Sequence, residues 1–189
     1  MKITVNPAGA ALNQYLMKMA LPLGAYFIVE YLVRNYSASN IFLGFLNLPM
    51  MVITVVLVFI IMKGMRDKLL DGHIPGFMAW TFGVQLMLFA GLLEAAFIYV
   101  FNEFIVPTNL VTVHQQMLIQ YQEVLDTVKA LPNQGNMVAS ATKLMQDTID
   151  LLKETPVSSP IETAMSMLSN NVFYGMFIML FVAPIIKKK

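Results

Sequence analysis

Cysteine is absent from the sequence, and charged residues are scarce, at 12% of its 189 positions. Without cysteine the chain forms no disulfide, no thiolate nucleophile and no cysteine-ligated zinc or iron–sulfur centre. Soluble domains usually carry about 25% charged residues, so this chain has too little polar surface for a water-soluble globule. The formal net charge of +1 and the lack of a basic stripe argue against a nucleic-acid partner.

Catalytic signatures are also missing. The only two histidines, His73 and His114, have no second ligand at a metal-binding spacing. No Walker loop, no Ser–His–Asp set and no paired catalytic carboxylates in a water-accessible cluster are visible. The sequence therefore predicts no catalytic residue, no metal site and no cofactor, and we expect a protein that is not an enzyme.

Long hydrophobic runs are what the sequence has in place of these features. Hydrophobic residues make up 58% of the chain, and residues 77–102 contain a single charge, Glu94. A helix rises ~1.5 Å per residue and the hydrocarbon core of a bilayer is ~30 Å thick, so about 20 apolar residues cross it. The sequence predicts four membrane spans: residues 15–33, 41–62, 77–102 and 163–186.

Residues 104–159 differ from the rest because they are polar and amphipathic. Two stretches carry apolar residues at helical three–four spacing, and the segment LPNQGN at 131–136 separates them. Ser159, Pro160 and Glu162 form a helix-start signal before the last span. The predicted fold is therefore all-α: residues 1–189 form one transmembrane domain, an integral-membrane four-helix bundle with an extracytoplasmic amphipathic helical hairpin between spans 3 and 4.

The basic residues predict the orientation in the membrane. Four crossings put eight basic positions on the side of the termini: Lys2, Lys18, Lys63, Arg66, Lys68 and residues 187–189. Four lie on the other side: Arg34, Lys129, Lys143 and Lys153. Because cytoplasmic loops are enriched in Lys and Arg, both termini are predicted to be cytoplasmic. The run at 66–68 is interpreted as a topology signal that contacts lipid phosphates.

Four polar residues lie within the predicted spans at a similar depth in the outer leaflet, and Arg34 directly follows the first span. They are predicted to form one intramembrane cluster: Glu30, Arg34, Glu94, Asn170 and Asn171. Arg34 follows Glu30 by four residues, so the two can pair on one helix face. A carboxylate exposed to lipid costs roughly 2.5 to 3.5 kcal/mol, so Glu94 is expected to face the bundle, a water cavity or a partner.

Two interpretations of this cluster remain open. One is functional: a proton- or cation-coupled site, or a pocket for a polar headgroup. The other is structural, because interhelical hydrogen bonds in membranes hold helices together at only ~0.6 kcal/mol per pair.

The third span also carries a row of small residues: Ala79, Gly83, Gly91 and Ala95. Small side chains let helix backbones approach closely. The row is interpreted as a helix-packing face, either within the chain or between two copies of it.

Residues 66–107 carry a resemblance to a known family. They include RDK at 66–68, GHIPGF at 72–77, Gly83 and YVFNEFIVP at 99–107. In these motifs the chain resembles the domain-of-unknown-function family 4199, a group of bacterial four-span integral membrane proteins without an assigned activity. The resemblance implies a multi-pass protein of the bacterial inner membrane. It also implies an accessory role in envelope glycan assembly, beside a polyprenyl-phosphate glycosyltransferase.

Two functions are consistent with these observations. The first is a non-enzymatic accessory or scaffold protein that binds a membrane partner or a lipid-linked intermediate. The second is a small oligomeric proton- or cation-coupled transporter or channel that uses Glu94. The expected partners are the lipid bilayer and either another membrane protein or further copies of the same chain.

Overall fold

The computed structural model describes residues 7–37, 41–130 and 136–186, and within these ranges it contains helices and no strand. The predicted all-α fold is confirmed. In chain order the elements are α1 (Pro7–Ser37), α2 (Ile41–Gly44), α3 (Asn47–Leu69), α4 (Gly76–Val100), the π-helix η1 (Phe101–Ile105), α5 (Asn109–Lys129), α6 (Asn136–Glu154) and α7 (Pro160–Ile186). Four segments are long and apolar enough to cross a membrane: Gly9–Ser37, Asn47–Leu69, Gly76–Ile105 and Pro160–Ile186.

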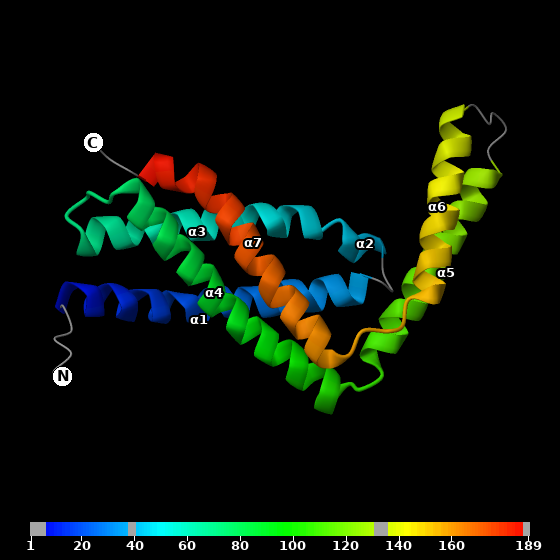
Figure 1. The fold of residues 1–189 in the computed structure, drawn as a ribbon, viewed down its shortest axis with the longest axis horizontal. Coiled ribbons are helices and arrows are strands. Elements are labelled where there is room, and N and C mark those ends of the chain that lie inside the picture. The colour runs from blue at the N-terminus through cyan, green and yellow to red at the C-terminus, as the bar shows by residue number, and fades with distance from the viewer. Residues whose placement is uncertain (1–6, 38–40, 131–135, 187–189) are drawn as a thin grey trace.

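The four long helices alternate in direction. The hydroxyl of Tyr26 on α1 donates to the carbonyl of Met50 near the start of α3, at 2.6 Å, and Tyr15 donates to the carbonyl of Ile61, at 3.3 Å. An earlier residue of α1 thus meets a later residue of α3, as antiparallel helices require. The start of α1 and the end of α7 lie at one end of the molecule, and the α5–α6 hairpin lies at the other (Figure 1).

Helices α4 and α7 form the tightest pair, and they pack through glycine. A Cβ built at Gly175 of α7 would lie 2.6 Å from Cγ of Met87 on α4. Reciprocally, a Cβ at Gly83 of α4 would collide with the thioether of Met179 on α7. Each glycine therefore receives a methionine from the other helix, and Met87 and Met179 are both fully buried. Because the helices approach so closely, polar groups on their facing sides are brought into contact.

Helix α3 begins and ends later than the predicted span, residues 41–62. It starts at Asn47, after the short helix α2 and a turn at residues 45–46. Pro49 has no N–H to donate to the carbonyl four residues earlier, and it lies in the first turn of α3, where no such donor is needed. At its other end α3 continues to Leu69, and Gly72 then breaks the chain direction with a φ of 80°.

The hairpin between the third and fourth long helices is present as predicted. Helices α5 and α6 pack on each other and bury Leu125 and Ile149, and they run crosswise over the end of the bundle (Figure 1). The predicted break at residues 131–135 lies outside the described residues, as do the predicted charge positions Lys2 and 187–189.

Helix α7 starts as the sequence predicts. The Ser159 N–H donates to the carboxylate of Glu162 at 2.8 Å, and the Glu162 N–H donates to Oγ of Ser159 at 3.3 Å. This reciprocal pair is a capping box. It fixes the residue at which the chain leaves the hairpin and enters the bundle.

Candidate functional site

A cavity of about 250 Å³ lies between α1, α3, α4 and α7, and we call it the central cavity. All five residues of the predicted polar cluster line it. Among the described residues, its lining is Phe27, Glu30, Arg34, Met51, Glu94, Met167, Asn170, Asn171 and Tyr174. Helices α1, α4 and α7 each contribute polar side chains, because the alternating directions bring these positions to the same depth.

Glu94 is the most deeply buried member of this group. Only 2% of its surface is exposed, and the side-chain amide of Asn171 donates a hydrogen bond to its carboxylate. Gly91 makes the contact possible, since a Cβ there would lie 3.2 Å from Cβ of Asn171. The packing glycine and the polar pair are thus parts of one interface. Asn170, by contrast, is exposed at the edge of the cavity.

The pair expected between Glu30 and Arg34 does not form. Glu30 is half-buried and accepts a hydrogen bond of 3.4 Å from Oγ1 of Thr54 on α3. The guanidinium of Arg34 instead points to Met167 on α7, with 3.5 Å between its Nη2 and the sulfur. Both neighbours belong to other helices, which explains why helical spacing within α1 did not predict them.

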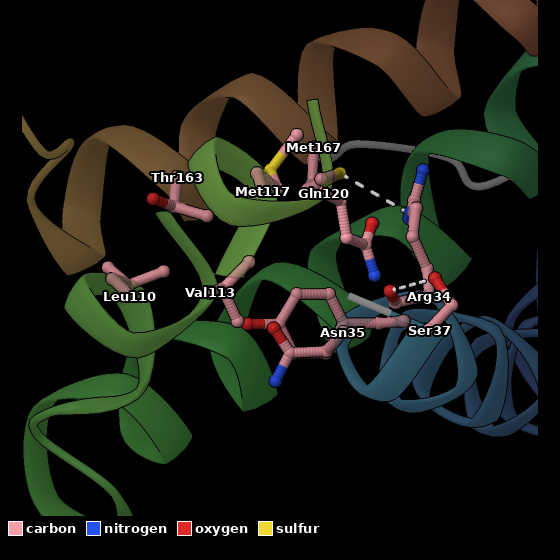
Figure 2. A pocket seen from close by; sticks show the side chains of 10 residues that line it. Arg34, Asn35, Ser37, Leu110, Val113, Met117, Gln120, Thr163 and Met167 are labelled. Carbon is pink, nitrogen blue, oxygen red and sulfur yellow. Dashed lines mark hydrogen bonds between the residues drawn. The ribbon is translucent and has the colours of Figure 1, made fainter. Parts of the chain in front are cut away.

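A second hollow, the outer pocket, has a volume of about 370 Å³ and lies between the end of α1, the first half of α5 and the start of α7. Its lining is Tyr31, Arg34, Asn35, Ser37, Leu110, Val113, Met117, Gln120, Thr163 and Met167. Figure 2 shows Arg34, Ser37 and Gln120 at one end of this pocket and Leu110 and Val113 at the other. Arg34 and Met167 belong to both the outer pocket and the central cavity, so the two adjoin.

A third hollow, the apolar groove, also has a volume of about 370 Å³ and separates α3 from α7. It is lined by Leu48, Met51, Val52, Val55, Tyr174, Phe177, Ile178 and Phe181. Met51 and Tyr174 are shared with the central cavity, and Tyr174 donates to the Met51 carbonyl at 3.3 Å. Val52, Phe177 and Phe181 are exposed, so the groove opens on the outer surface of the bundle.

The three hollows follow one another along α7. The outer pocket uses Thr163 and Met167, the central cavity residues 167–174, and the apolar groove residues 174–181. From Thr163 to Phe181 the helix rises about 27 Å, at ~1.5 Å per residue. The lining changes over this distance from amphipathic to polar and then to apolar.

A buried amide network beside the outer pocket was not predicted. Asn102 donates to the hydroxyl of Tyr31 at 2.8 Å and to the carbonyl of Ile98 at 2.7 Å. Asn109 donates to Asn102, and Asn35 donates to Asn109, each at 2.8 Å. The network joins α1, the π-helix and the first residue of α5, and so it sets the position of the hairpin. The irregular turn of η1 carries Asn102, and π-helical turns leave no periodic sequence signal.

Arg66 has a different role from the one expected. It is 6% exposed, and its Nη1 donates to the carbonyl of Ile186 at the end of α7, at 2.9 Å. Asp67 accepts from the same guanidinium at 2.6 Å. Arg66 thus donates to a carbonyl at the C-terminus of α7, and cations are favoured at helix C-termini. The side chain is buried in the protein and does not face lipid.

Within the described ranges no group of three or more His, Cys, Asp or Glu side chains is arranged to hold a metal ion. His73 is exposed and His114 is half-buried on α5. The central cavity brings together two carboxyl groups, two amides and one guanidinium. The apolar groove adjoins it along α7.

These features define a class of protein: an all-helical chain with four helices suited to cross a membrane and a helical hairpin between the third and fourth. Residues 17–188 match the model of the family described as "Protein of unknown function (DUF4199)". The chain belongs to this family, as the motifs between residues 66 and 107 predicted. No curated protein and no solved structure matches the chain.

Proposed function

We propose that the protein is a non-enzymatic accessory protein of the membrane that binds a lipid along α7. The observation that carries the proposal is the order of the three hollows. A membrane lipid has a hydrocarbon chain, a polar junction and a headgroup in sequence. The apolar groove, the central cavity and the outer pocket offer matching surroundings in the same sequence.

The groove supports a lipid over a water-soluble ligand. Its wall consists of aliphatic and aromatic side chains from α3 and α7. The groove opens on the surface of the bundle that would face the surrounding lipid. A hydrocarbon chain can enter sideways from the bilayer and bury apolar surface without crossing water. The polar groups of the central cavity would then hold the junction between chain and headgroup.

In this proposal both termini are cytoplasmic, the hairpin lies on the outer face of the inner membrane, and the protein presents or retains its lipid for a partner. A lipid-linked intermediate of envelope glycan assembly belongs to this ligand class. The excess of basic residues on the side of the termini supports the orientation.

Filling the groove tests the proposal. Val52 and Val56 are both exposed valines of α3, and only Val52 lines the groove. Each is replaced by tryptophan, the proteins are purified from their native membranes, and the retained lipids are identified by mass spectrometry. We expect a defined lipid to co-purify with the wild type and with Val56→Trp and to be lost from Val52→Trp. Equal retention by both variants, or no retained lipid at all, would overturn the proposal.

Transport is the second candidate, and the burial of Glu94 supports it. A carboxyl group that is 2% exposed inside a polar cavity can carry a proton between two sides of a membrane. Proton-driven flux in proteoliposomes that disappears in Glu94→Gln would favour transport. Flux of this kind with no bound lipid would replace the first proposal.

A further inference from the structure

We propose that Arg34 binds a phosphate group of the lipid, and that the outer pocket receives the group attached to that phosphate. The hairpin would then select the headgroup, because α5 forms one wall of this pocket. The inference rests on the lipid-binding function proposed above and names its ligand class: a lipid whose phosphate lies between chain and headgroup.

Charge is the first argument. Arg34 is the single charged side chain among the residues that line the outer pocket. The two carboxyl groups, Glu30 and Glu94, line the central cavity and not the outer pocket. Among the described residues, the lining of the outer pocket thus carries one positive charge and no negative one, which suits an anion on that side of Arg34, while both carboxyl groups lie on its other side.

The hydrogen bonds of Arg34 are the second argument. A guanidinium has five N–H donors in a planar fork that matches phosphate geometry. In the described part of the chain, its side chain makes one hydrogen bond, at 3.5 Å to the sulfur of Met167. Thioether sulfur is a weak acceptor. The donors of an exposed guanidinium at the rim of two hollows are therefore available to a stronger acceptor.

Position is the third argument. Arg34 and Met167 are the residues shared by the central cavity and the outer pocket. The hydrocarbon chain lies on the groove side of this junction, and a headgroup lies on the outer side. A phosphate that joins the two must pass Arg34. On the outer side, Gln120 and Thr163 supply polar groups and Leu110 and Val113 supply apolar surface, so the pocket can hold an organic group.

The test compares three short-chain lipids with identical acyl chains, added to the full-length protein in detergent. Diacylglycerol lacks phosphate, phosphatidic acid ends in phosphate, and phosphatidylglycerol carries a further group on it. We expect wild-type affinity to rise from diacylglycerol to phosphatidic acid to phosphatidylglycerol. Arg34→Gln should lose about tenfold or more in affinity for the two phosphate lipids, the effect of one charge-assisted contact, with diacylglycerol unchanged.

Two further variants separate the parts of the proposal. Lys153→Gln removes the same charge from an exposed position of α6 and should bind all three lipids as the wild type does. Met117→Trp fills the outer pocket from α5 and should weaken phosphatidylglycerol while leaving phosphatidic acid unaffected. An equal loss of all three lipids in Arg34→Gln would show a structural role for Arg34 and overturn the inference.

The failure of the inference is distinguishable from failure of the proposed function. If the wild type binds the three lipids with equal affinity, lipid binding stands and phosphate recognition fails. If it binds none of them, both fail. Tight binding of inorganic phosphate that depends on Arg34, with no added affinity from the acyl chains, would replace the lipid by a soluble phosphate ligand and overturn the inference.

Discussion

Glu94, the one charged side chain of α4, shows how such a group is accommodated in a mostly apolar helix. It lies on the face of α4 that meets α7 and accepts a hydrogen bond from the amide of Asn171. Exposure of this group to lipid would cost several kcal/mol, so the close approach at Gly91 and the amide of α7 give it a protected place. Its partner Asn171 lies on another helix, 77 positions later in the sequence.

Replacing Glu94 separates hydrogen bonding from charge. Glu94→Ala leaves the Asn171 amide without its acceptor and opens space beside it, so we expect a loss of about 1–3 kcal/mol in the free energy of unfolding. Glu94→Gln keeps an acceptor oxygen and should cost less than about 1 kcal/mol. Thermal unfolding of the detergent-solubilised protein measures both. Asn170→Ala, at an exposed position, is the control; equal melting temperatures for all variants would contradict a stabilising role.

At the level of elements, the packing of α4 against α7 depends on the reciprocal fit of a methionine from each helix against a glycine of the other. Gly175→Ala places a methyl group 2.6 Å from Cγ of Met87, near the rigid base of that side chain. We expect this overpacking to cost about 1–3 kcal/mol and to lower the melting temperature. Gly9→Ala is the matched control, because nothing lies within 4 Å of a Cβ there, and it should be neutral or slightly stabilising. A neutral Gly175→Ala would mean that the helices separate at little cost.

The hairpin is held to the bundle by the amide network, and Asn109 is its central member. Asn109→Ala deprives Asn102 of one partner and Asn35 of another. Both are buried, so we expect the first turns of α5 to open more often. Hydrogen exchange of α5 amides measures this opening. Thr112→Ala removes a hydroxyl that donates to the carbonyl of Thr108, directly before α5, and should leave exchange unchanged, whereas equal rates in both variants would place the anchor elsewhere.

Sequence patterns predicted the elements better than their junctions. Apolar runs are recognised by their length. The Ser159–Glu162 capping box and the polar residues of the cluster stand out against a hydrophobic background, so their positions could be predicted. The turn before Asn47, the π-helix and the buried role of Arg66 were not. Each depends on contacts between distant segments, such as that of Arg66 with Ile186. A local pattern of residues in the sequence does not predict such contacts.

The whole molecule offers a direct test of orientation, because it has no cysteine of its own. Single cysteines are placed at Leu144 on the hairpin, which is 69% exposed, and at His73, which lies at the opposite end and is also exposed. With the proposed topology, a membrane-impermeant maleimide labels the first in intact cells and the second only after permeabilisation. The reverse pattern would invert the orientation, and labelling of both in intact cells would contradict a crossing between them.

The methionines that fill the two glycine notches make the bundle sensitive to oxidants. Met87 and Met179 are inaccessible while α4 and α7 stay together, so peroxide reaches them only when the helices part. Once formed, a sulfoxide is bulkier and polar, and it no longer fits against Gly175 or Gly83. A brief separation of the two helices would thereby become a lasting one, and the rate at which these two sulfurs are modified would report how often α4 and α7 separate.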